Sequence, residues 1–436
     1  MTAEITPQNP ATAPDIIRWR KACLYVVPWA LVAVAAGVIS CRVGLWQGGA
    51  VVASVALALG LGAMPATRGF QFTGWIVAAV TASMCFPSAF LHWGSFDLRN
   101  KWVILLVVQL VMFGMGTQMS LADFKGVAKT PRGVLVGIVC HFSIMPLVGV
   151  ALTKVFAFPP EIAAGIILIG SCSSGLASNV MAYLAGANLV LSVTVTAITT
   201  LVAPFMTPLL MKLFAGTLVE VKFVNMMMEI IKIVIVPIGA ALLHDYLKTA
   251  SATGRRWVHV IAVAAALWLA MLALGGWGWV AGQVGESARL VIGTLGFFLA
   301  AVLVGLLYHV AVRRWPAIGR KMPLGSMAGI VYFTAVTTAA GRDNLLQIGA
   351  LLFVAAALHN AAGYFFGYWL SRGAGLDKNS ARSVAFEVGL QNGGMASGLA
   401  GSMGKLATVG LAAAIFSPWM NISGSILANY WRRRKA

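Results

Sequence analysis

The chain has 436 residues, of which 60% are hydrophobic and 10% are charged, and its mean hydropathy is +0.88. It has no polar run long enough for a soluble domain, so the composition excludes a soluble globular protein and indicates a polytopic membrane protein. The formal net charge of +19 would suit a nucleic-acid partner, but the positions of the basic residues argue against one.

Windows of about 20 apolar residues predict fourteen membrane spans. The first seventeen residues are polar and lack the apolar core of a signal peptide, so we expect the first window to be a retained span. In chain order the windows are 22–41, 46–64, 70–92, 102–120, 133–155, 161–185, 189–214, 223–247, 257–276, 289–311, 326–341, 346–370, 380–403 and 406–430.

The basic residues are concentrated in alternate connections between these windows. With the N-terminus inside, 21 of the 31 Lys and Arg residues lie on the cytoplasmic side, nine lie on the opposite side, and Lys232 lies within a span. This asymmetry follows the positive-inside rule and predicts both termini in the cytoplasm. It also accounts for the net charge without a nucleic-acid partner.

The segment FEVGLQNGG at 386–394 places a carboxylate, two amides and three glycines inside an apolar window. A charge in hydrocarbon costs several kcal/mol unless it is neutralised or paired, so Glu387 is a candidate functional residue. Glycines ease the unwinding of a helix, and unwound backbone at membrane depth is tolerated where it lines a cavity or is covered by protein. We therefore expect a broken helix whose oxygens bind a cation.

A second segment, GSCSSGLASNVMAYLAG at 170–186, interrupts another apolar window with small and hydroxyl residues. On its own it is also compatible with a kinked, tightly packed helix. Two glycine-interrupted spans in corresponding parts of two halves are, however, typical of a transporter site. The pair predicts two broken helices that meet.

Five motifs resemble those of the bile acid:sodium symporter family, within the bile/arsenite/riboflavin transporter superfamily. They occur in that family's order with similar spacing: HFSIMP at 141–146, ASNVMAYLAGANLVLSVTVT at 177–196, LHNAAGY at 358–364, EVGLQN at 387–392 and SPWMNISGSILANYW at 417–431. The resemblance covers residues 70–247 and 326–431, which is the length of the family's ten-helix unit.

The resemblance implies an all-α membrane fold with two inverted repeats of five helices and two broken, crossing helices, plus about four extra helices here. The implied core spans are 133–155, 161–185, 189–214, 346–370, 380–403 and 406–430, and the implied panel spans are 70–92, 102–120, 223–247 and 326–341. The expected divisions are an N-terminal tail with an extra helix pair at 1–69, the first repeat and the start of the second at 70–247, an inserted pair at 248–325, and the remainder with a basic tail at 326–436.

The resemblance also implies a first sodium site built from side-chain oxygens of Ser178, Asn179, Ser192, Thr196 and Glu387, all of which are present. Hard cations prefer oxygen ligands, and Ser192 and Thr196 share one helical face because they stand four residues apart. The alternative is that each hydroxyl bonds the carbonyl four residues before it.

A second family site would use Glu387, Gln391 and the carbonyls of Val388 and Leu390, together with a glutamine where this chain has His141. Imidazole is a poor sodium ligand but holds a proton near neutral pH beside a carboxylate. We therefore interpret His141 as a replacement for the second sodium ion, with a neutral His hydrogen-bonded between helices as the alternative.

The substrate region departs from the family, which commonly has a threonine where Leu176 stands. Asn392 and Asn421 match positions that face the family's substrate cavity, and we expect both to donate amide hydrogens to a substrate. Because the pocket has changed, we expect a small organic anion or polar metabolite rather than a specified compound.

Taken together, the sequence predicts a sodium-coupled symporter, with an uncoupled or proton-assisted facilitator or a transport-like sensor on the same fold as the alternative. No HExxH or GxSxG motif suggests an enzyme, and no cofactor besides the coupling sodium ion is expected. The expected partners are a small molecule, sodium and the bilayer, and we expect the protein in a bacterial inner membrane. Elsewhere in the spans, we expect Glu229 to pair with Lys232 and Gly363 and Gly367 to allow close helix packing.

Overall fold

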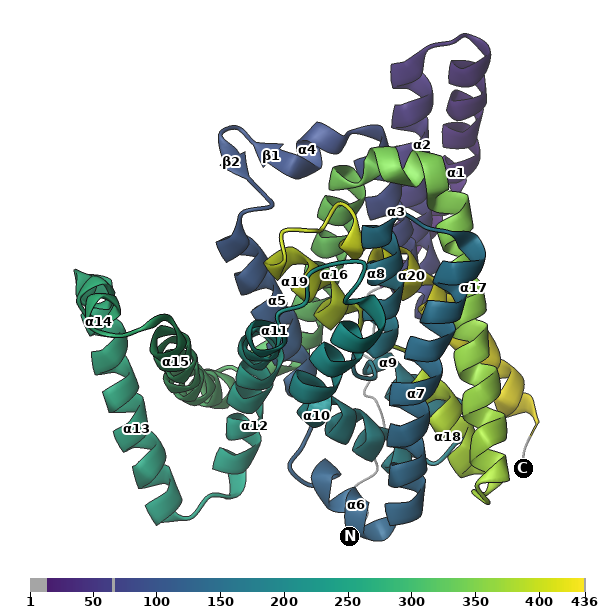
Figure 1. The fold of residues 1–436 in the computed structure, drawn as a ribbon. Helices are drawn as coiled ribbons and strands as arrows, with labels where there is room; N and C mark the ends of the chain where they lie inside the picture. The colour runs from purple at the N-terminus through teal and green to yellow at the C-terminus, as the bar shows by residue number, and fades with distance from the viewer. Residues whose placement is uncertain (1–13, 65–66, 435–436) are drawn as a thin grey trace. The chain divides into compact units, whose positions relative to one another are not determined.

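The computed structural model describes residues 14–64 and 67–434, which are helical apart from a short hairpin and the connecting segments (Figure 1). The chain forms two compact units, residues 1–90 and 91–436. Each unit is described by itself below.

The first unit is a helical hairpin followed by a third helix. Helix α1 (Pro14–Ile39) packs along α2 (Val43–Leu61), and α2 packs against α3 (Gln71–Cys85), which follows the short η1 (Arg68–Phe70). The hairpin is close because α2 is rich in small residues: a Cβ at Gly49 would lie 2.9 Å from the carbonyl oxygen of Ala30. Helix α4 (Pro87–Leu91) ends this part of the chain.

The second unit holds the remaining elements. In chain order these are β1 (His92–Trp93), β2 (Phe96–Asp97), α5 (Lys101–Gly116), η2 (Asp123–Lys125), α6 (Gly126–Lys129), α7 (Pro131–Phe156), α8 (Pro160–Ser171), α9 (Ala177–Leu184), α10 (Leu189–Ala215), α11 (Phe223–Ile230), η3 (Ile231–Ile235), α12 (Val236–Thr249), α13 (Ala252–Met271), η4 (Leu272–Gly276), α14 (Trp277–Gln283), α15 (Glu286–Arg314), α16 (Ala317–Ala340), α17 (Arg342–Gly373), α18 (Lys378–Gly389), α19 (Gly393–Ser402) and α20 (Val409–Arg433).

Each of the fourteen predicted windows overlaps a helix or a pair of helices. Fewer than fourteen of the described helices are long enough to cross a bilayer on their own. Within the described residues nine helices are long and apolar enough to cross a bilayer, and the bent pair α13 and α14 would make a tenth. The other windows fall on α3, α5 and the two interrupted pairs α8–α9 and α18–α19, whose helices are shorter. The structure thus supports a polytopic all-helical membrane protein.

The largest difference between a predicted window and the start of its helix occurs at α16. The window at 326–341 corresponds to α16, which begins nine residues earlier at Ala317. The early turns of α16 carry Arg320 and Lys321, so a hydropathy window excludes them although the backbone is already helical.

Two groups of helices pack within the second unit. Helix α5 packs against α12 and α16, whereas α7, α8, α10, α17, α18 and α20 pack mainly against one another (Figure 1). These groups contain the spans that were assigned to panel and core, apart from 70–92. The inverted symmetry of two repeats stays a prediction.

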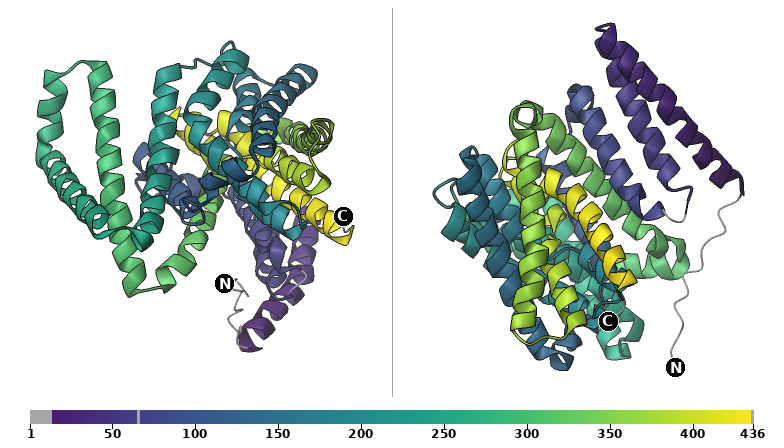
Figure 2. Two further views of the ribbon diagram at one scale, coloured as in Figure 1. Left: turned by 90° about the horizontal axis from the view of Figure 1, so that it is seen from below. Right: turned by 90° about the vertical axis from the view of Figure 1, so that its right-hand side faces the viewer.

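The inserted helices form an outlying hairpin of the second unit. Helix α13 packs against α15, and α15 packs against α12, which joins the hairpin to the rest of the unit. Figure 2 shows this hairpin in its left-hand view as a pair of green helices that projects from the helices beside it.

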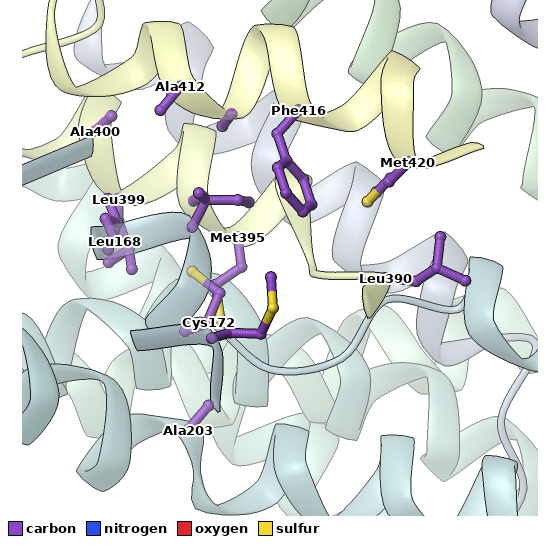
Figure 3. Packing of buried hydrophobic residues seen from close by; sticks show 14 of the residues in the cluster. Leu168, Cys172, Ala203, Leu390, Met395, Leu399, Ala400, Ala412, Phe416 and Met420 are labelled. Atoms are coloured by element: carbon purple, nitrogen blue, oxygen red, sulfur yellow. The ribbon is translucent and has the colours of Figure 1, made fainter. Parts of the chain in front are cut away.

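The main hydrophobic core lies where the interrupted helices meet their neighbours. Cys172, Leu390 and Met395 are fully buried, and Figure 3 shows their side chains beside the two non-helical segments, with Phe416 of α20 above them. This apolar packing excludes water from the polar groups of the interruptions.

The predicted close packing at Gly363 and Gly367 is confirmed, and the structure shows that the partner is α18. A Cβ at Gly363 would lie 2.9 Å from the Cα of Gly389, and one at Gly367 would lie 3.0 Å from the Cα of Ala385. Two polar residues of α17 also bond across helices: His359 Nε2 lies 2.8 Å from the Met145 carbonyl oxygen, and Asn360 Nδ2 donates to the Gly389 carbonyl at 2.8 Å.

Candidate functional site

Both predicted broken helices are present, and their interruptions cross. Helix α8 ends at Ser171 and α9 begins at Ala177, while α18 ends at Gly389 and α19 begins at Gly393. The intervening segments pair as an antiparallel bridge between Ser174 and Gln391. The Asn392 amide donates to the Ser173 carbonyl at 2.8 Å, and the Gly175 amide donates to the Leu390 carbonyl at 2.9 Å.

This pairing satisfies backbone groups that the helix breaks release, which is the condition for non-helical backbone inside a membrane. It also explains the glycine in the first interruption. A Cβ at Gly175 would lie 2.7 Å from the Gln391 carbonyl oxygen, closer than real Cβ atoms approach. The two interrupting segments can therefore cross only because position 175 has no side chain.

Five oxygen-bearing side chains meet beside the crossing. Ser192 Oγ lies 2.5 Å from Glu387 Oε1, and Thr196 Oγ1 lies 2.8 Å from Glu387 Oε2. The same two hydroxyls lie 2.9 and 3.1 Å from Asn179 Oδ1. Ser178 Oγ lies 3.3 Å from Thr196 Oγ1. The structure thus brings together α9, α10 and α18 through all five residues predicted for the first sodium site.

The cluster has more acceptor oxygens than hydrogen atoms to share. Ser192 and Thr196 each carry one hydroxyl hydrogen, yet each hydroxyl lies within hydrogen-bond distance of both a Glu387 oxygen and Asn179 Oδ1. When Glu387 is ionised and Asn179 points its oxygen at the two hydroxyls, two of these four contacts have no hydrogen between the oxygens. A bound cation would relieve this crowding of lone pairs, so the donor set fits an alkali-metal ion.

Burial strengthens the case for a cation. The side chains of Ser178, Ser192 and Glu387 are 0% exposed. No salt bridge joins Glu387 to a basic side chain among the residues that the structure describes. A buried carboxylate is costly unless a counter-charge or a proton neutralises it.

His141 lies on α7 and contacts the ends of both half-helices. Its Nε2 lies 2.8 Å from the Cys172 carbonyl oxygen, just past α8, and its Nδ1 lies 3.0 Å from the Glu387 carbonyl oxygen, near the end of α18. The ring is 0% exposed. A neutral imidazole donates from one nitrogen only, so two carbonyl neighbours are both satisfied only when the ring carries a second proton.

The other groups predicted for the second ion site are close to the crossing but are mostly engaged elsewhere. Val388 O accepts from Gln391 Nε2 at 2.7 Å, and Leu390 O accepts from the Gly175 amide. Gln391 Oε1 is buried and has no hydrogen-bond partner in the described part of the chain. His141 therefore contacts different carbonyls from the two predicted as ligands.

Two of the three residues predicted for substrate lie at half-helix ends, and the third lies within α20. Leu176 precedes α9, and Asn392 caps α19 by accepting from the Met395 amide at 3.0 Å. Asn421 Nδ2 donates to the Ser417 carbonyl at 2.9 Å within α20. Asn392 and Asn421 are thus already hydrogen-bonded, and their role toward a substrate stays a prediction.

The sequence did not lead us to predict Ser174 and Thr199 as members of the site. Ser174 Oγ lies 3.3 Å from both Ser178 Oγ and the Leu390 carbonyl oxygen, and its amide lies 3.4 Å from Thr199 Oγ1. Ser174 thus joins the oxygen cluster to the crossing. The available signal was spacing: Ser174 and Ser178 are four residues apart, and Thr199 is three residues after Thr196.

Comparison with known proteins agrees with this arrangement. A sequence profile of the Sodium Bile acid symporter family matches residues 104–283. The sodium-dependent transporter YocS of Bacillus subtilis is 32% identical over 368 residues, which cover 84% of this chain and 92% of the relative.

More distant relatives belong to plants and animals. The probable sodium/metabolite cotransporter BASS1 of Arabidopsis thaliana is 28% identical, covering 83% of this chain and 73% of the relative. The human ileal sodium/bile acid cotransporter is 28% identical, covering 66% of each chain. With interrupted helices, a buried oxygen cluster and these similarities in hand, we conclude that the chain belongs to the sodium bile acid symporter family and is a membrane transporter rather than an enzyme.

Proposed function

We propose that the protein is a secondary active transporter that couples sodium entry to uptake of a small organic anion or polar metabolite by alternating access. The observation that carries the proposal is the buried cluster of Ser178, Asn179, Ser192, Thr196 and Glu387 at the crossing of two interrupted helices. The relatives whose names specify sodium dependence support it.

The coupling follows from where the cluster lies. Sodium would neutralise Glu387 and link α18 to α9 and α10, because its ligands come from all three helices. The ion would thereby hold the two interruptions together and fix the half-helix ends beside them. Sodium then raises substrate affinity, and substrate raises sodium affinity by the same factor.

An anion suits the substrate position because helix N-termini carry partial positive charge. Helix α19 begins beside the crossing, with Asn392 at its cap. The α9 start carries Leu176. We propose that the substrate binds against these two ends, with Asn421 as a further amide donor once its intrahelical bond is exchanged.

The protein would have the family's architecture of two inverted repeats with core and panel helices. Two inverted five-helix repeats would place α8–α9 and α18–α19 in equivalent positions, and their antiparallel bridge supports that symmetry. The core helices would rock against α5, α12 and α16 around the fixed site. A bacterial inner membrane with both termini in the cytoplasm fits the charge asymmetry of the connections.

The geometry of His141 favours a second candidate, a proton-assisted form of the same transport. A protonated ring would act as a fixed cation between the negative ends of two half-helices. It would take the place of a second sodium ion. We propose one sodium ion per transport cycle, with His141 holding a proton.

The test is a thermal-stability screen of the purified protein against small organic anions, in sodium chloride and in choline chloride. The proposal expects a ligand-induced rise in melting temperature that needs sodium and is absent in Glu387→Gln. Glu229→Gln serves as the matched control, because Glu229 is a carboxylate of another helix that pairs with Lys232. A ligand shift that is the same in both salts would contradict sodium coupling.

A further inference from the structure

A groove with a volume of about 770 Å³ lies between α17, α18 and α20, away from the oxygen cluster. This volume is in the range of ligand-binding pockets. One end is lined by Lys378, Arg382 and Arg434, and the wall is lined by aromatic side chains that include Trp369 and Trp419. None of its described lining residues is acidic.

Arg382 is the unusual member of this groove. It is 3% exposed, and no carboxylate pairs with it anywhere in residues 14–64 and 67–434. Its two terminal nitrogens donate to neutral oxygens, Asn379 Oδ1 at 3.4 Å and the Arg434 carbonyl at 3.0 Å. Its Nε is buried and has no hydrogen-bond partner among the residues that the structure describes. Because a buried charge normally has a counter-charge, a bound anion would stabilise this guanidinium.

The residues around Arg382 add positive charge and an aromatic surface rather than compensation. The guanidinium carbon lies 5.6 Å from the ring centroid of Trp431, and that of Arg434 lies 4.6 Å from the ring centroid of Tyr430. These distances are within the range of cation–π contacts, which favour the observed positions of the guanidinium groups. The basic end of the groove therefore carries two guanidinium groups that are held by aromatic contacts.

The groove is basic at one end and apolar along its wall, which matches the charged headgroup and the apolar tails of a lipid. The three basic residues lie at one end of the helices, where α18 begins and α20 finishes, and so at the membrane surface. Phe365, Trp369 and Ile426 line the groove further along α17 and α20, and each is more than half exposed. In membrane-spanning helices such side chains face acyl chains. A headgroup at the basic end would thus have its tails along the apolar wall.

We propose that this groove is a binding site for an anionic phospholipid of the leaflet at the basic end, whose phosphate binds Arg382, Lys378 and Arg434. Basic pockets between membrane helices on the cytoplasmic side are suited to such headgroups. The lipid would also contact α18, the helix that carries Glu387. The site is independent of the proposed sodium coupling.

The test is native mass spectrometry of the purified full-length protein with phosphatidylglycerol or phosphatidylcholine of the same acyl chains. Glycerol 3-phosphate serves as a headgroup without chains. The variants are Arg382→Gln, Lys378→Gln and Arg320→Gln. Arg320 is the matched control because it is an exposed arginine of α16 outside the groove. Melting temperatures without lipid check that each variant is folded.

We expect the wild type to retain phosphatidylglycerol at least about fivefold better than phosphatidylcholine, the effect of one or more cations near an anionic headgroup. Arg382→Gln should abolish this preference, Lys378→Gln should reduce it, and Arg320→Gln should leave it unchanged. If Arg382→Gln does not fold, the exposed Lys378 carries the test alone.

Three results would overturn the proposal. The first is a wild-type protein that shows no preference between the two lipids. The second is an Arg320→Gln variant that loses as much preference as the groove variants, which would indicate diffuse surface charge. Displacement of the lipid by an equal concentration of glycerol 3-phosphate would identify a soluble anion as the occupant instead.

Discussion

Replacing Glu387 with glutamine tests the oxygen cluster most sharply, because the side chains have nearly the same shape. Glutamine keeps an oxygen for Ser192 or Thr196 and removes the negative charge. Attraction between unit charges about 4 Å apart is worth about 4 kcal/mol at an effective dielectric constant of 20. That energy corresponds to a loss of sodium affinity approaching a thousandfold.

The assay is a titration of melting temperature with sodium chloride, with choline chloride used to hold ionic strength constant. Wild-type protein should be stabilised by sodium in a saturable way, and Glu387→Gln should not respond. In choline the variant should be at least as stable as the wild type, since an unpaired buried carboxylate is costly. Glu229→Gln should behave as wild type. A Glu387→Gln protein that binds sodium within about tenfold of wild type would refute the reasoning, because such a difference is far smaller than the charge term.

The hydroxyls give a graded version of the same test: Ser192→Ala or Thr196→Val should each lower sodium affinity by about tenfold to a hundredfold, since each removes one oxygen next to a charged group. In the same titration, Ser143→Ala should have no effect, because Ser143 is not part of the oxygen cluster and its hydroxyl donates to the Val139 carbonyl. His141→Gln should make uptake less sensitive to pH and add a second sodium ion per cycle; unchanged pH and sodium dependence would contradict the proposal that His141 holds a proton in place of that ion. Gly175→Val should abolish ligand binding, because its side chain would meet the Gln391 carbonyl, and a functional, folded variant would show that the crossing is not required. Asp377→Ala should destabilise α18 by about 1 kcal/mol, measured by thermal unfolding, because Asp377 caps the amides of Asn379 and Ser380.

The oxygen cluster was predictable from the sequence because its residues belong to long, ordered motifs. Ser192 and Thr196 stand one helical turn apart, and Glu387 lies within a glycine-rich segment. Apolar windows located the longer helices for a similar reason, since hydropathy responds to twenty residues at once. The apolar windows are a local signal, and the motifs are recognised by their resemblance to a family.

The partners of His141 were not predictable in the same way. Its two contacts, with the carbonyls of Cys172 and Glu387, involve backbone atoms 31 and 246 residues away, and backbone oxygens leave no trace in side-chain identity. The same applies to Arg382, because the lack of a paired carboxylate within the described residues becomes visible only when the surrounding helices are in place. Helix lengths were also poorly predicted, because hydropathy does not register where α8 and α18 end at their interruptions.

The most direct measurement of the central claim is equilibrium binding of radioactive sodium to the purified protein, with saturating substrate analogue where the screen supplies one. We predict one sodium ion per chain for the wild type, none for Glu387→Gln and one for Glu229→Gln. Sodium binding that persists in Glu387→Gln, or a wild-type protein that binds no sodium, would contradict an ion site in the oxygen cluster.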